Sequence, residues 1–133
     1  MEVVIDSNVL FRTLISGGDI IDLVFDKNLT LYAPKMLWIE FLNNKKEILS
    51  KSKLSNSDFS ILTKLLLKRI KLVERQKYQE HLTKAKELLE EHEKDADFIA
   101  LCLYKNCKLW TYESRLFKIG FGISTKEISK KLL

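Results

Sequence analysis

The sequence predicts an α/β protein, a three-layer α/β/α sandwich with a short, mostly parallel central sheet. Short apolar runs rich in β-branched residues alternate with longer segments whose apolar residues recur at helical spacing. The chain has 133 residues, which is the ordinary size of one compact domain, so we expect a single domain over residues 1–133. Hydrophobic residues make up 46% and charged residues 31%, which excludes a disordered or low-complexity protein.

Four short segments have the composition of buried strands. They are residues 2–6, 29–33, 70–73 and 108–111. The first reads Glu-Val-Val-Ile-Asp and stops at Asp6, so a carboxylate is expected at the end of a buried strand.

In the segments between these strands, the apolar residues recur at helical spacing. Gly17 and Gly18 separate the first two helices, and Asp19 is a candidate N-cap for the second. Pro34 is expected in the first turn of a long helix, and Ser124 is expected to cap the last one. The predicted helices cover residues 8–14, 19–25, 36–49, 55–68, 78–91, 98–103 and the segment after 124.

Basic residues are concentrated in the middle of the chain. The formal net charge is +5, but residues 43–86 hold twelve Lys or Arg and four Asp or Glu, a net of +8, which leaves −3 for the remainder. Such a segment is either a solvated helix surface or a surface for a polyanionic partner. Both interpretations stay open at this point.

The N-terminal residues have no basic leader or small-residue cleavage site, and no apolar run approaches a membrane span of ~20 residues. Cys102 and Cys107 lack the second Cys/His pair of a zinc site, so two reduced thiols are expected. We therefore expect a cytoplasmic protein with no membrane association.

Five acidic residues occupy unusual places in this pattern. Asp6 ends a strand, Glu40 lies on an apolar helix stripe, Asp95 and Asp97 begin a very apolar helix, and Glu113 follows the strand at 108–111 by two residues. Ligands of open parallel sheets bind beyond the carboxyl ends of the strands, where Asp6 and Glu113 are expected.

Each acid taken singly has a structural alternative, as a turn residue, a helix N-cap or a first-turn acid. Several carboxylates in one crevice repel one another unless a cation neutralises them. Carboxylate oxygens suit Mg²⁺ or Mn²⁺, and two such ions can bind both the attacking and the leaving oxygen of a phosphodiester.

Three segments of the chain resemble the PIN-domain nucleases, a family that includes VapC-like toxins and related RNA-processing proteins. Val-Val-Ile-Asp-Ser-Asn-Val-Leu at residues 3–10 resembles the opening strand and its Asp-Thr/Ser-Asn motif. Residues 33–42, which contain Glu40, resemble the segment with the second acid. Residues 94–113 resemble the third acid, its apolar helix and the strand that ends in Trp-Thr-x-Asp.

This resemblance implies a metal-dependent ribonuclease with four catalytic, metal-binding acids: Asp6, Glu40, Asp95 and Glu113. Asp97 is expected either to face the metal or to support its ligands, and Asp95 is preferred as the third acid because its spacing to Thr111 resembles that of the family. Glu113 departs from the family, in which Asp or Asn is commoner at this position.

Three polar residues are expected to support these acids. Ser7 and Asn8 are expected to orient Asp6 or bound water by hydrogen bonds, and Thr111 to position the last acid.

An acidic crevice repels RNA, so a basic surface has to bind the strand. The candidate RNA-binding residues are Lys45, Lys46, Lys51, Lys53, Arg69 and Lys71. The resemblance also implies an antitoxin protein as a partner if the chain is a toxin, and a homodimer, for which Ile15, Ile20, Ile21 and Val24 offer an apolar face.

Two alternatives to a ribonuclease remain. One is an RNA-binding or interaction module that kept the fold but cleaves weakly, which Glu113 permits. The other is a Mg²⁺-binding receiver-type phosphoacceptor domain, which needs an aspartate after a middle strand; the predicted strand ends at Pro34 and Val73 supply none.

Overall fold

The structure is a computed structural model that describes residues 1–133, and its centre is a five-stranded sheet with all strands parallel. The strand order is β3-β2-β1-β4-β5. The strands are β1 (Glu2–Ile5), β2 (Thr30–Pro34), β3 (Ile70–Val73), β4 (Lys108–Trp110) and β5 (Gly122–Ile123). The predicted sheet is confirmed, and its parallel character is complete.

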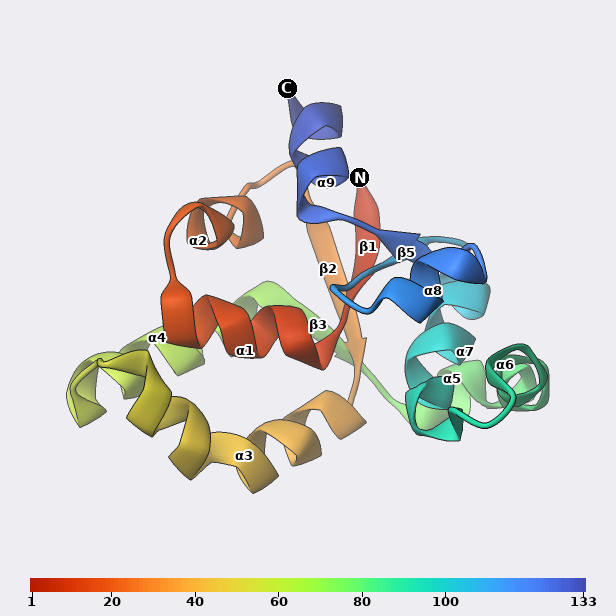
Figure 1. The fold of residues 1–133 in the computed structure, drawn as a ribbon, viewed down its shortest axis with the longest axis horizontal. Coiled ribbons are helices and arrows are strands. Elements are labelled where there is room, and N and C mark those ends of the chain that lie inside the picture. The colour runs from red at the N-terminus through yellow and green to blue at the C-terminus, as the bar shows by residue number, and fades with distance from the viewer.

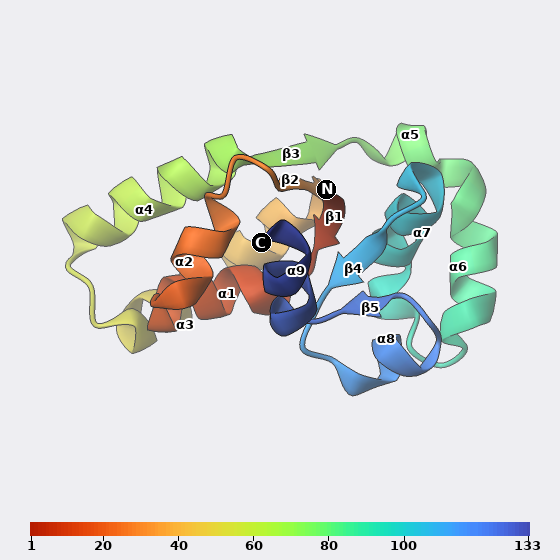
Figure 2. The same ribbon diagram turned by 90° about the horizontal axis from the view of Figure 1, so that it is seen from above.

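Helices cover both faces of this sheet, so the predicted α/β/α sandwich is confirmed (Figures 1 and 2). The first face carries α1 (Ser7–Ser16), α2 (Asp19–Val24), α3 (Met36–Ser52) and α4 (Asn56–Arg69). The second carries α5 (Arg75–Tyr78), α6 (Leu82–Leu89), α7 (Ala96–Lys105) and α8 (Ser114–Lys118), with short 3₁₀ turns at Gln79–His81 and Glu93–Asp95. The terminal helix α9 (Thr125–Leu132) lies on the side of α1 in Figure 2.

The strand order reverses between β1 and β4. The chain proceeds outward from β1 through β2 to β3, crosses to the other face, and returns as β4 on the opposite side of β1. Val4 is paired with Tyr32 of β2 and with Leu109 of β4. Such a reversal places a crevice at the carboxyl ends of the two strands that flank it. Asp6 follows β1 and Thr111 follows β4 at this point.

The interior contains one cluster of 31 buried hydrophobic residues that extends over both faces of the sheet. Six polar or charged residues are also buried: Asp6, Ser7, Thr13, Ser52, Asp95 and Thr111. Buried polar groups cost free energy unless they are paired, and four of these six follow β1, precede α7 or follow β4. The polar part of the interior therefore coincides with the predicted site.

Several local predictions need correction. Pro34 is the last residue of β2, paired with Val73, because it lies at a position whose missing N–H the sheet tolerates. The N-cap of α2 is Gly18, at φ 67°, and Asp19 is its first residue. β5 was not predicted, because a two-residue strand carries no periodic signal.

The helix expected over residues 78–91 is divided. Tyr78 ends α5, a 3₁₀ turn follows, and α6 begins at Leu82. The remaining helix predictions agree within a few residues, and Ser124 forms a capping box with Glu127 as its sequence position predicts. Both cysteines are free thiols, and no helix has the length and apolar composition needed to cross a bilayer.

Candidate active site

Asp6 lies at the switch point of the sheet, between the end of β1 and the start of α1. Its side chain is 4% exposed, and its Oδ1 accepts a hydrogen bond of 2.8 Å from the Ser7 N–H at the N-terminus of α1. The pKa of Asp6 is raised to about 6, mainly by burial; the hydrogen bonds from Thr111 and Ser7 oppose this shift, and the charges of Asp95 and Glu113 contribute to it. Asp6 is thus a buried carboxylate that the fold places beside other acids.

Thr111 connects the end of β4 to the end of β1. Its hydroxyl donates to Oδ2 of Asp6 at 2.7 Å, and its oxygen accepts the Glu113 N–H at 3.1 Å. The Asn8 amide donates to the same hydroxyl oxygen at 3.5 Å and accepts the Tyr112 N–H at 3.4 Å. These bonds join α1 to the loop after β4.

Glu40 reaches the same region from α3. The Ser7 hydroxyl donates to Oε2 of Glu40, so Ser7 contacts Glu40 with its side chain and Asp6 with its backbone. Partial burial raises the pKa of Glu40, and the charges of Asp95 and Asp97 act in the same direction, against the Ser7 hydrogen bond and Lys94. Glu40 is therefore within range of the charges of Asp95 and Asp97.

Asp95 and Glu113 share one partner, Arg115. The guanidinium of Arg115 donates through Nη2 to Oδ2 of Asp95, and lies 3.0 Å from Oε2 of Glu113. Asp95 is at the start of α7 and Glu113 at the start of α8, so this cation joins two elements that follow different strands. Arg115 was missed in the sequence. The only available signal was its position two residues after Glu113.

Asp97 has different partners from the other acids. The Tyr78 hydroxyl donates to its Oδ2 at 2.5 Å, and Nε of Arg75 lies 3.5 Å away. Burial and the hydrogen bond to Asp97 raise the pKa of Tyr78. Asp97 therefore anchors α7 to α5, although its charge still acts on Glu40.

As arranged, no group of three or more His, Cys, Asp or Glu side chains lies close enough together to hold a metal ion. Asp95 and Glu113 are turned to Arg115 instead. The donor chemistry nevertheless fits a hard divalent cation, because carboxylate oxygens are its preferred ligands. The buried Asp6 has no cation among its hydrogen-bond partners, and its charge is coupled unfavourably to two other acids.

The predicted basic residues do not form one surface. Lys45, Lys46, Lys51 and Lys53 are exposed on or just after α3, and Lys51 is paired with Glu47. Arg69 donates to the backbone carbonyls of Asp26 and Leu29, so it has a structural role that its position in a basic segment did not reveal.

Lys71 lies apart from the lysines of α3. Its Nζ is 5.8 Å from the Tyr32 ring, which Lys105 of α7 also approaches, at 4.3 Å. Lys71 therefore belongs to the sheet face that α7 covers, whereas α3 lies on the other face.

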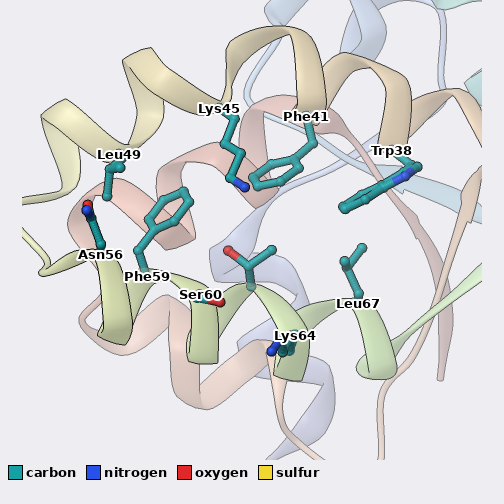
Figure 3. A pocket seen from close by; sticks show the side chains of 10 residues that line it. Trp38, Phe41, Lys45, Leu49, Asn56, Phe59, Ser60, Lys64 and Leu67 are labelled. Carbon is teal, nitrogen blue, oxygen red and sulfur yellow. The ribbon is translucent and has the colours of Figure 1, made fainter.

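A pocket of about 400 Å³ opens between α3 and α4 (Figure 3). Trp38, Phe41 and Phe59 form its aromatic part, and Lys45 of α3 and Lys64 of α4 also line it. The ring centroids of Trp38 and Phe41 are 5.4 Å apart in a stacked arrangement. None of the predicted acids lines this pocket, so it is separate from the carboxylate site.

Residues 4–132 match the PIN domain family. The chain therefore belongs to the PIN-domain family and has the nuclease-type fold of that family. No curated protein sequence matches the chain. The family assignment disfavours the receiver-type alternative, and the structure places Lys35 and Glu74, not an aspartate, directly after β2 and β3.

The expected apolar dimer face is only partly available. Ile20 and Ile21 of α2 are partly exposed, but Val24 is fully buried in the core. Val24 faces inward because it is in the last turn of an amphipathic helix that packs on the core through that turn.

Proposed function

We propose that this chain is a Mg²⁺- or Mn²⁺-dependent endoribonuclease that hydrolyses phosphodiester bonds of single-stranded or structured RNA. The observation that carries the proposal is the environment of Asp6, a buried carboxylate at the switch point of the sheet whose pKa is raised by burial and by two neighbouring acids. Perturbed carboxylates in a crevice at a switch point are typical of functional sites.

Asp6, Glu40, Asp95 and Glu113 are the residues that would hold the cation. When bound, a divalent ion makes a coordinated water more acidic and neutralises charge on the phosphodiester. Thr111 and Ser7 hold the carboxylates of Asp6 and Glu40 in fixed orientations by donating hydrogen bonds to them.

The lysines of α3 and of the turn after it supply the phosphate contacts in this proposal. Residues 36–69, which form the α3–α4 hairpin, hold seven basic and three acidic residues, so this part of the first face attracts a polyanion. Lys45, Lys46 and Lys53 are exposed and lack an acidic partner among the ion pairs.

The experiment is cleavage of a labelled single-stranded RNA by the purified chain in Mn²⁺ or Mg²⁺, with and without EDTA. We expect cleavage that needs the divalent ion and that Asp6→Asn abolishes. An RNase contaminant is controlled by purifying the wild type and the variant in parallel. RNA binding without cleavage in either metal would replace the proposal with the second candidate, an RNA-binding module of low activity, which the engagement of Glu113 by Arg115 favours.

We also propose that the chain is the toxin of a toxin–antitoxin pair and that it forms a homodimer. A small DNA-binding antitoxin encoded beside this chain is the expected partner. Co-expression of that neighbour, followed by size-exclusion chromatography with light scattering, tests both the complex and the dimer. A monomer that does not bind the neighbour contradicts both.

A further inference from the structure

Arg115 is a cation in the middle of the acidic site. Its guanidinium contacts Asp95 from the start of α7 and Glu113 from the start of α8, and its side chain is 29% exposed. The same two carboxylates act on Asp6 through their charge. Arg115 therefore neutralises two of the four acids that the proposed function assigns to a divalent ion.

The hydrogen bonding of this guanidinium is incomplete. Its Nε is buried and has no hydrogen-bond partner. A buried donor without a partner carries a desolvation penalty, so the bound position of Arg115 is less favourable than its two ion pairs suggest. Arg115 is on the short helix α8 and its side chain is partly exposed, so the guanidinium can move away from the two carboxylates into solvent.

From these contacts we infer that Arg115 is a positioning residue that occupies the cation position between Asp95 and Glu113 and is displaced when a divalent ion binds there. This inference rests on the proposed function, since it concerns the same site. The guanidinium and a divalent ion cannot both bind Oδ2 of Asp95 and Oε2 of Glu113. The ion pairs of Arg115 therefore lower the apparent affinity of the site for the metal. Arg115 would thereby set the ion concentration at which the site fills.

Removal of the guanidinium tests the competition directly. We expect Arg115→Gln to bind Mn²⁺ about tenfold more tightly in calorimetry, because the ion no longer has to displace charge-assisted hydrogen bonds. Without metal the variant should melt at a lower temperature than the wild type, since Asp95 and Glu113 lose their counter-charge. Added Mn²⁺ should raise its melting temperature more than that of the wild type.

Two variants separate competition from a general change of charge. Arg115→Lys keeps a cation but not the planar guanidinium that contacts both carboxylates, so its Mn²⁺ affinity should lie between those of the wild type and Arg115→Gln. Arg12→Gln removes the same charge from α1, where Arg12 stacks on the Tyr112 ring at 4.3 Å and contacts no acid. We expect it to leave Mn²⁺ affinity nearly unchanged.

A measurement on the wild type covers the case in which Arg115→Gln does not fold. In ¹⁵N-edited NMR during a Mg²⁺ titration, the Arg115 Nε–H signal should shift together with the backbone amide of Ser7, which is bonded to Asp6. The signal reports the environment of the guanidinium independently of catalysis.

The outcomes distinguish this inference from the proposed function. If Mn²⁺ binds neither the wild type nor Arg115→Gln, the metal-dependent function fails, and the inference fails with it. If the wild type binds Mn²⁺, but Arg115→Gln binds it equally or more weakly and the Arg115 signal stays still, only the inference is overturned. Tighter binding by Arg115→Gln, with Arg115→Lys intermediate and Arg12→Gln near the wild type, supports it.

Discussion

The hydroxyl of Thr111 donates a 2.7 Å hydrogen bond to Oδ2 of Asp6, although 105 residues separate the two in the chain. Thr111 is 1% exposed and Asp6 4% exposed, so the bond forms inside the protein, across the carboxyl ends of β4 and β1. Because β1 and β4 are neighbours in a parallel sheet, both residues occupy equivalent positions just beyond their strands.

Replacement of Asp6 by Asn should separate stability from activity. In the folded protein the pKa of Asp6 is about 6, against an ordinary value of 3.8. The folded state therefore binds this proton more tightly than the unfolded state does, and the free energy of unfolding that this contributes is lost as pH rises from about 4 through about 6. At neutral pH in EDTA, the free energy of unfolding of Asp6→Asn should therefore equal that of the wild type or exceed it by up to roughly 3 kcal/mol. Cleavage of RNA should be lost.

Urea melts at about pH 4 and about pH 7.5 check the sign of this effect, because the advantage of Asp6→Asn should shrink at the lower pH. A variant that is less stable at neutral pH but still cleaves RNA would show that Asp6 is an ordinary helix cap.

The second prediction concerns Thr111→Val, which keeps the shape of the side chain but removes its hydroxyl. Asp6, Asn8 and the Glu113 N–H all lose a partner, so we expect a loss of about 1–2 kcal/mol in the free energy of unfolding. RNA cleavage should fall as well, because Asp6 is no longer held in one orientation. Thr111→Ser retains the hydroxyl, and should recover most of both quantities.

The roles of Asp95 and Asp97 should separate when each is replaced by Asn. Asp97 is bonded to Tyr78 and Arg75, away from the guanidinium that holds Asp95. We expect Asp95→Asn to abolish Mn²⁺-dependent cleavage and to weaken Mn²⁺ binding in calorimetry. Asp97→Asn should mainly lower stability, by about 1 kcal/mol. Equal losses of Mn²⁺ affinity in the two variants would mean that Asp97 is also a ligand.

Neutralisation of the α3 lysines should weaken RNA binding without affecting metal binding. The variant replaces Lys45, Lys46, Lys51 and Lys53 with Gln, and its affinity for a short RNA should depend less steeply on salt, because each phosphate contact contributes to that slope. The matched control replaces four exposed lysines of α6 and α9 with Gln: Lys84, Lys86, Lys130 and Lys131. An equal change of slope in both variants would indicate net charge rather than a defined surface.

Arg69 and Lys71 should behave differently from these lysines. Arg69→Met removes the donor to two backbone carbonyls and should destabilise the protein by about 1–3 kcal/mol. Lys71→Gln should leave both stability and RNA affinity almost unchanged, because Lys71 is exposed on the other face of the sheet. Thermal melts and RNA titrations of the two single variants check this difference.

Much of the fold could be predicted because it depends on local patterns. Ser124 caps its helix as expected, since a capping residue acts on backbone N–H groups two or three positions away. The strand at residues 2–5 and the acid after it are likewise visible in a run of five residues. Pro34 was misplaced because a helix start and the last position of a strand both tolerate a missing N–H.

The sequence by itself determined the alternation of strands and helices, the order of the acidic motifs and the position of Asp6 after the first strand, because periodicity and capping are properties of neighbouring residues. Tertiary structure alone decided that Arg115 joins Asp95 to Glu113, that Arg69 holds the loop before β2, and that Lys71 lies apart from the lysines of α3. These contacts depend on the strand order and on which face each helix covers. A side chain's partner is then set by packing between distant segments, which no local pattern encodes.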